Sequence, residues 1–220
     1  MKKIFGRDGL LSRALRDYEY RPIQETMALE VRAAIGEGRA SIIEAGTGTG
    51  KTLAYLVPAV LSQKKTIIST GTKTLQDQLL DQDIPFVKKH IPQPFRAVCM
   101  KGRANYLCLY RFHRFIGQPE LLPDGVTDLS KTLIDWSQQT TSGDRAEIHW
   151  LPDDFAGWEP VSASGDRCLG QKCPMYEQCF LTNLRQKAAN AEIVVVNHHL
   201  FFADLSVRSG GYGQVTISRR

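Results

Sequence analysis

A glycine-rich segment, Glu-Ala-Gly-Thr-Gly-Thr-Gly-Lys-Thr at residues 44–52, constrains the fold more than any other part of this chain. It matches the phosphate-binding pattern G-x-x-x-x-G-K-[ST] except that Ala45 replaces the first glycine. In such loops successive N–H groups point at phosphate oxygens, Lys51 reaches the β- and γ-phosphates, and the Thr52 hydroxyl ligates Mg²⁺. We therefore predict catalytic roles for Lys51 and Thr52. The predicted nucleotide-binding residues are Ala45, Gly46, Thr47, Gly48, Thr49, Gly50, Lys51 and Thr52.

The flanks of this loop test the prediction, because a phosphate-binding loop follows a strand and precedes a helix. Ala40–Glu44 is a short run containing β-branched residues, which predicts a buried parallel strand. Leu53–Val57 predicts the helix, with Pro58 as a mild conflict. The alternative is a glycine-rich turn between unrelated elements. The flanks together with the Lys-Thr pair favour a nucleotide site.

Elsewhere the chain alternates between strand and helix patterns, which predicts an α/β fold with a parallel sheet. Residues 101–180 break this alternation, and in a chain of 220 residues they predict an insertion. No segment has the apolar length needed to span a bilayer, so we expect no membrane partner and a cytoplasmic location. The predicted helices are Ile23–Ile35, closed by Gly36 and Gly38, and Lys73–Asp83; the predicted strands are Thr66–Thr70, Arg96–Met100 and Glu192–Asn197.

Charge and aromatic residues point to nucleic acid in one region. The chain has a net charge of +5, and residues 84–119 contain no Asp or Glu. Cations can neutralise phosphates, and aromatic rings can stack on unpaired bases. The alternative is a solvated basic face with the rings in the core. The cations are Lys88, Lys89, Arg96, Lys101, Arg103, Arg111 and Arg114, interleaved with Phe86, Phe95, Tyr106, Tyr110, Phe112 and Phe115.

The cysteines suggest metal chemistry. Cys168, Cys173 and Cys179 form a close triplet, and Cys99 or Cys108 could supply a fourth ligand. Disulfides are uncommon in the cytoplasm, so a metal or redox role is the natural reading. This spacing favours a four-thiolate iron–sulfur cluster over zinc, with inert buried thiols as a third possibility.

Taken together, these motifs resemble the XPD-like iron–sulfur DNA helicases of superfamily 2, in particular the bacterial DinG/YoaA type. The resemblance runs from about Gly6 to Val215, in the order expected of the family. The segments that carry it are residues 44–52, Ser69–Leu79, Lys101–Cys108, the cysteine triplet and Val195–Phe201.

The resemblance implies an ATP-dependent 5′-to-3′ DNA helicase with a RecA-like parallel sheet and an inserted cysteine-rich iron–sulfur domain. It implies a first motor domain over residues 1–100 and 181–220, and a cluster insertion over 101–180. It implies ATP and Mg²⁺ at the loop, and single-stranded or forked DNA as partner. Replication and repair proteins are possible further partners, which the sequence does not identify. The implied residues are Arg21 and Gln24 for the nucleotide base, Thr70, Thr72, Gln76, Lys101 and Arg103 for DNA, and Cys108, Cys168, Cys173 and Cys179 for a [4Fe–4S] cluster.

The resemblance also matches Asn197, His198 and His199 to a strand-end segment of the family, where packing or DNA contact is favoured over a metal site. One departure from the family pattern qualifies these expectations. The Asp-Glu-Ala-His box of the family does not follow within these 220 residues. We therefore expect no DNA-stimulated ATP hydrolysis from these residues alone. The alternatives are a non-catalytic nucleotide- and DNA-binding fragment, or a zinc-containing nucleic-acid-binding module.

Overall fold

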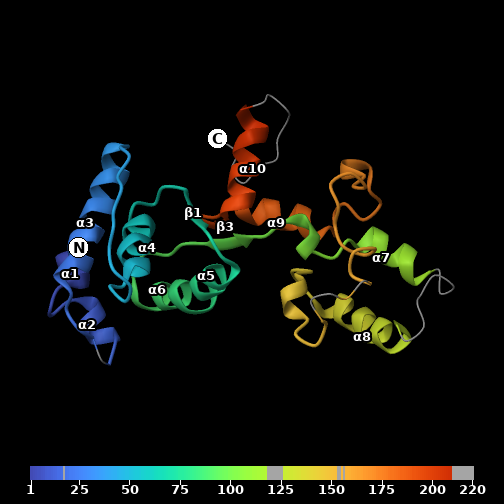
Figure 1. Cartoon of the computed structure of the whole chain (residues 1–220), viewed down its shortest axis with the longest axis horizontal. Coiled ribbons are helices and arrows are strands. Elements are labelled where there is room, and N and C mark those ends of the chain that lie inside the picture. Colours follow the sequence, from blue (N-terminus) through green and yellow to red (C-terminus); the bar gives the residue numbers. More distant parts are fainter. Residues whose placement is uncertain (17, 118–125, 153–154, 156, 210–220) are drawn as a thin grey trace. The chain divides into compact units, whose positions relative to one another are not determined.

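The computed structural model describes residues 1–16, 18–117, 126–152, 155 and 157–209 (Figure 1). The chain divides into two compact units, which are described one at a time. Unit 1 comprises residues 1–99 and the described residues from Asn190 onward, and unit 2 comprises residues 100–189. Within the described part of the chain, no helix is both long enough and apolar enough to cross a bilayer.

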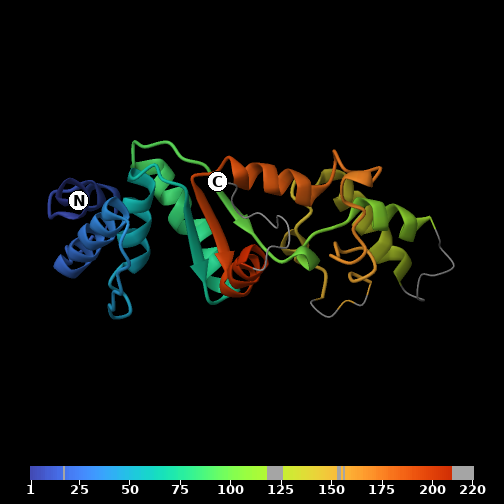
Figure 2. The same cartoon turned by 90° about the horizontal axis from the view of Figure 1, so that it is seen from above.

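The centre of unit 1 is a three-stranded sheet of order β1-β3-β2, made of β1 (Thr66–Thr70), β2 (Ala97–Met100) and β3 (Ile193–Asn197). β1 pairs with β3 in parallel, with Ser69 opposite Val196. β3 is the central strand, and Ile193–Val196 are fully buried. A strand covered on both faces reads as a continuous apolar run, which is why its sequence predicts it well. Three of the four expected strands are confirmed (Figure 2).

The helices of unit 1 pack around this sheet over one hydrophobic core. Phe5, Leu11 and Val57 are among its fully buried side chains. The helix expected after the loop is present and passes through Pro58, which is itself buried. The helices are α1 (Lys2–Phe5), α2 (Leu10–Ala14), α3 (Pro22–Glu37), α4 (Lys51–Leu61), α5 (Lys73–Gln78), α6 (Ile84–His90) and α10 (His198–Ser209).

The strand expected over Ala40–Glu44 is absent, and this prediction is wrong. The segment has no regular secondary structure, and Ile42 is fully exposed. Side-chain bonds hold it against α3 instead, because the Glu30 carboxylate accepts from Arg39 Nη1 at 2.7 Å and from Ser41 Oγ at 2.8 Å. A β-branched run forms a strand only where another strand offers a backbone ladder, and here polar anchors take its place.

Two helix boundaries also differ from the expectation. Gly36 lies inside α3, and only Gly38 ends the helix, in the left-handed conformation at φ +68°. The helix expected over Lys73–Asp83 ends as α-helix at Gln78 and continues as a π-helical segment, η1 (Leu79–Asp83), before α6 begins. A π segment adds one residue to the turn and shifts the helical register that follows.

Unit 2 has its own hydrophobic core. Trp158 is buried in it, and its indole Nε1 donates to the Ala104 carbonyl at 2.7 Å. Isolated antiparallel bridges join Tyr106 to Asp144 and Leu107 to Ser162. Its helical elements are η2 (Arg103–Asn105), α7 (Leu109–Ile116), α8 (Val126–Gln139), η4 (Arg145–Glu147), η5 (Gly170–Lys172) and α9 (Phe180–Ala189).

Candidate functional site

The glycine-rich loop has the backbone shape that phosphate binding requires. Gly48 and Gly50 have φ angles of +75° and +76°, in the left-handed region that favours glycine. Gly50 caps α4, which begins at Lys51. The loop therefore delivers its backbone to the start of an eleven-residue helix, where N–H groups and the helix dipole both attract anions.

The two residues expected to act on the nucleotide lie on this loop. Lys51 Nζ donates to the carbonyls of Ala45 at 2.9 Å and Gly46 at 2.6 Å. Its ammonium group therefore lies across the loop and must leave these carbonyls to reach a phosphate. Thr52 hydrogen-bonds to Tyr55. Burial raises the pKa of the Tyr55 hydroxyl, and the bond to Thr52 acts in the opposite direction. Tyr55 was not predicted as part of the site, although residues three apart are neighbours on a helix surface.

Arg21 and Gln24 both reach the loop from the start of α3. Gln24 is buried, and its Nε2 donates to the Gly50 carbonyl at 3.0 Å. Arg21 donates through Nη1 to the Gly48 carbonyl and also pairs with Glu19 at 3.0 Å. The structure thus gathers these two residues, more than twenty positions away in the sequence, around the same short turn.

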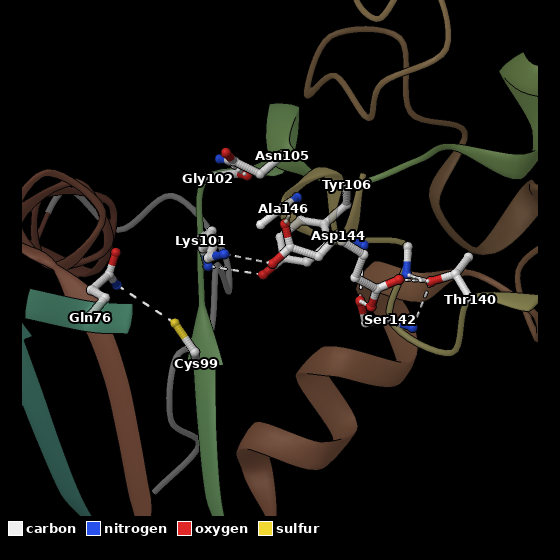
Figure 3. Close-up of polar contacts among 12 residues, drawn as sticks. Gln76, Cys99, Lys101, Gly102, Asn105, Tyr106, Thr140, Ser142, Asp144 and Ala146 are labelled. Carbon is white, nitrogen blue, oxygen red and sulfur yellow. Dashed lines mark hydrogen bonds and ion pairs between the residues drawn. The ribbon is translucent and has the colours of Figure 1, made fainter. Parts of the chain in front are cut away.

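The proposed DNA-contact residues of unit 1 follow β1. Thr70 is buried, and its hydroxyl donates to the Thr72 carbonyl at 3.2 Å. Thr72 is exposed and caps α5 by accepting from the Leu75 N–H at 3.2 Å. Gln76 is buried instead of exposed, and its amide donates to the Cys99 sulfur at 3.7 Å (Figure 3).

In unit 2, Lys101 is held in an ion pair. Its Nζ lies 2.8 Å from Asp144 Oδ2, and the two side chains are only 15% and 17% exposed (Figure 3). Asp144 also accepts from the Ala146 N–H at 2.9 Å. The Lys101 N–H donates to the Tyr106 hydroxyl at 3.0 Å. Lys101 therefore anchors the loop around Asp144 in this structure.

The acid-free stretch from 84 to 119 is divided between the two units, with the boundary after Cys99. Tyr106 and Phe112 are buried in the core. Arg96 pairs with Glu192 at 2.9 Å, and this bonding lowers the pKa of Glu192 to about 2. Arg111 donates to the Ser162 carbonyl at 2.6 Å. Much of the stretch is therefore occupied in holding the fold.

The cysteines separate into one in unit 1 and four in unit 2. Cys99 lies in β2, whereas Cys108, Cys168, Cys173 and Cys179 all belong to unit 2. All five are free thiols. Burial raises the pKa of Cys108, and the nearby charges of Cys179 and Cys173 raise it further. Burial lowers the pKa of Arg185, and the nearby charge of Arg103 lowers it further. The charges of Cys168 and Cys179 act in the opposite direction.

Cys173 and Cys179 thus lie close enough to Cys108 to act on it electrostatically, and Cys168 and Cys179 both lie near Arg185. Among the described residues, however, no group of three or more Cys, His, Asp or Glu side chains is close enough together to hold a metal ion. The type of donor fits an iron–sulfur cluster, but the distances between the donors are not those of a coordinated ion.

Comparison with known proteins decides the family. The sequence model of the DEAD/DEAH box helicases matches residues 21–133, which is just over half of the chain. The chain belongs to the DEAD/DEAH box helicase family. The matched region contains the loop, Arg21, Gln24 and the end of β1. The α/β architecture with a parallel strand pair is consistent with the RecA-like domain of such helicases.

Curated relatives of this helicase-family chain are considerably longer than it is. It is 44% identical over 215 residues to the ATP-dependent DNA helicase YoaA of Escherichia coli K12, covering 98% of this chain and 34% of the relative. It is 36% identical over 208 residues to the ATP-dependent helicase DinG of Mycobacterium tuberculosis H37Rv, covering 84% and 31%. It is 32% identical over 203 residues to the 3′-5′ exonuclease DinG of Bacillus subtilis 168, covering 90% and 22%. The chain therefore spans about a third or less of these relatives.

Proposed function

We propose that this chain is the nucleotide- and DNA-binding front part of an ATP-dependent 5′-to-3′ DNA helicase of the DinG/YoaA type. The loop at 44–52 carries this proposal, because its two left-handed glycines, Lys51 and the start of α4 are arranged for phosphate. The similar YoaA and DinG proteins named above as ATP-dependent helicases support it. Hydrolysis and strand separation are proposed for the whole helicase.

The proposed chemistry at the loop is electrostatic. Lys51 exchanges its two carbonyl acceptors for the β- and γ-phosphates, and Thr52 exchanges Tyr55 for Mg²⁺. A fixed cation and oriented N–H groups stabilise the charge that develops on a transferred phosphoryl group. Arg21 and Gln24, already against the loop, are proposed to reach the nucleotide base from α3.

Nucleotide binding by the 220-residue chain tests this assignment. Titration with ATP and Mg²⁺ in a calorimeter should show one site, and Lys51→Ala should weaken binding by at least about tenfold, since hydrogen bonds to charged groups contribute about 1.5–3 kcal/mol. Lys89→Ala, which removes an exposed lysine far from the loop in sequence, is the matched control. Equal affinities for the two variants would show that the loop does not hold the phosphates.

For DNA, we propose that the partner is single-stranded or forked and that its backbone follows the end of β1. Thr72 is exposed and available for phosphate, while Thr70 supports it from below. Gln76 would contribute after leaving Cys99. In unit 2, Lys101 would contribute after leaving Asp144, and Arg103 is proposed beside it. Since DNA is the proposed substrate, we propose a cytoplasmic location and leave open any replication or repair partner.

We also propose that Cys108, Cys168, Cys173 and Cys179 converge on a [4Fe–4S] cluster when iron and sulfide are supplied, in an insertion between residues 101 and 180 of the motor domain. Their free thiols and their common place in unit 2 support this, together with the closeness of Cys173 and Cys179 to Cys108. Thiolate ligation of such a cluster would tie distant loops of the insertion together. Cys99, bonded to Gln76, has a separate structural role.

Anaerobic purification followed by iron, sulfide and zinc analysis tests the cluster proposal. We expect about four iron and four sulfide per chain, as a [4Fe–4S] cluster requires. Cys168→Ser should lose both, whereas Cys99→Ser should keep them. Stoichiometric zinc without sulfide would establish the zinc-containing module instead.

A further inference from the structure

The parallel pairing of β1 and β3 brings together two residues that are far apart in the sequence. Ser69 pairs with Val196 in register, and α10 starts at His198, directly after β3 ends. Ser69 Oγ and His198 Nδ1 are 2.7 Å apart, a hydrogen bond between residues separated by 129 positions. Figures 1 and 2 show α10 leaving the end of β3 beside β1.

The other edge of the His198 ring borders the turn that follows β1. A Cβ placed on Gly71 would lie 3.7 Å from both Cδ2 and Nε2 of His198. The imidazole therefore lies beside Gly71, with room for no more than a methyl group between them, while its Nδ1 is hydrogen-bonded to Ser69 in the strand. His198 is solvent-exposed, so this arrangement is at the surface, where Thr72 is also exposed.

The local fold is secured without this histidine. Thr72 caps α5 through the Leu75 N–H at 3.2 Å, and Asn197 caps α10 by accepting from the Leu200 N–H at 2.7 Å. Thr70 bonds to the Thr72 carbonyl at 3.2 Å and to the Val196 carbonyl at 3.5 Å. We therefore expect the Ser69–His198 hydrogen bond to orient the turn without being required for the packing of the strands and helices.

We propose that His198 is a positioning residue for DNA binding: through its hydrogen bond to Ser69 and its place beside Gly71, it restrains the backbone from Thr70 to Thr72 for contact with a phosphate. The inference rests on the proposed DNA binding at this strand end. Phosphate contacts by backbone N–H groups and hydroxyls depend on a fixed backbone, because they read position and not sequence. A histidine that is hydrogen-bonded to the strand before the turn and lies beside the glycine of the turn supplies that restraint.

The test uses the 220-residue chain and a fluorescein-labelled oligothymidylate of about 20 nucleotides, with anisotropy as the readout. His198→Ala and Ser69→Ala should each weaken binding about five- to tenfold, the effect expected for one hydrogen bond of about 1 kcal/mol or slightly more. The double variant should be no weaker than either single one, because both remove the same restraint. His198→Asn, whose amide can still bond to Ser69, should retain most of the affinity.

His199→Ala is the matched control, since His199 is also exposed and has no polar contact with the described residues. Melting temperature and ATP affinity should stay at the wild-type level in all variants. Wild-type affinity in His198→Ala, equal losses in His199→Ala, or a matching drop in melting temperature would each overturn the inference. If the unaltered chain fails to bind the oligonucleotide, the proposed DNA-binding function fails and the inference falls with it. If the chain binds and only Thr72→Ala weakens binding, that function stands and the role of His198 is refuted.

Discussion

Three glycines of the phosphate-binding loop would lose different amounts of stability if each were replaced by alanine, because backbone strain and steric collision arise at different positions. Gly46 is not in the left-handed region, and an added Cβ would come no closer than 3.9 Å to Thr49. Gly48 has φ +75° with nothing within 4 Å of such a Cβ. Gly50 has φ +76°, and its Cβ would fall 2.1 Å from Gln24 Nε2. Alanine therefore adds neither strain nor collision at Gly46 and backbone strain alone at Gly48. At Gly50 it adds both backbone strain and a collision with Gln24.

The expected losses of stability in the absence of nucleotide follow this order. The free energy of unfolding of Gly46→Ala should lie within about 0.5 kcal/mol of the wild type, because the change only reduces the conformational entropy of the unfolded chain. Gly48→Ala should cost about 1 kcal/mol, at the low end of the left-handed penalty for an L-residue. Gly50→Ala should cost about 2–3 kcal/mol, since displacing Gln24 also breaks its 3.0 Å bond to the loop.

Urea unfolding followed by far-UV circular dichroism measures these differences. Tryptophan fluorescence is the less direct probe of unit 1, because Trp136, Trp150 and Trp158 all belong to unit 2. Adding Gln24→Ala to Gly50→Ala should cost less than the two single changes together, since the collision is removed. Equal losses at Gly48 and Gly50, or full additivity with Gln24→Ala, would refute the reasoning.

Two further predictions concern ion pairs. Lys101→Met and Asp144→Asn should each lower the free energy of unfolding of unit 2 by about 1–2 kcal/mol, between the values for exposed and fully buried ion pairs. The double variant should lose less than the sum of the two single losses, because both changes remove the same pair. Tryptophan fluorescence in urea measures these losses, and strict additivity would contradict the pairing. The bonds of Glu192 to Arg96 lower its pKa from about 4.5 to about 2, so they favour the folded state above pH 4.5 and this contribution is lost as the pH falls toward 2. Glu192→Gln should flatten the fall in stability over that window, measured by circular dichroism in urea at successive pH values, and an unchanged slope would argue against the role of this carboxylate.

Much of the sheet could be predicted from the sequence because its strands carry their own signal. Ile193–Val196 are apolar and β-branched, and they are buried on both faces. Ala40–Glu44 carries a similar local signal, yet Glu30 binds Arg39 and Ser41 beside it and no strand forms. Local pattern expresses a preference for extended backbone, whereas a strand also requires a partner that lies elsewhere in the chain.

The candidate site shows the same division. The loop could be predicted because its glycines, Lys51 and Thr52 are contiguous. The pairing of Lys101 with Asp144, and of Ser69 with His198, joins residues 43 and 129 positions apart. The residues next to each member of these pairs in the sequence give no indication of its partner. Such contacts become visible only when the packing of strands and loops has brought the two segments together.

The π-helical segment η1 carries one extra residue between two positions that face the same way. Leu79 at its start, and Ile84 and Val87 after it, belong to the core of unit 1. Leu79 and Ile84 are five positions apart, the spacing of one π-helical turn. Removing one residue between 80 and 83 would leave them four apart, the spacing that keeps two side chains on one face of an ordinary α-helix. An inserted residue would instead turn Ile84 and Val87 away from the core by about 100°, the rotation per residue of an α-helix. The segment should therefore accept the loss of one residue far better than the gain of one.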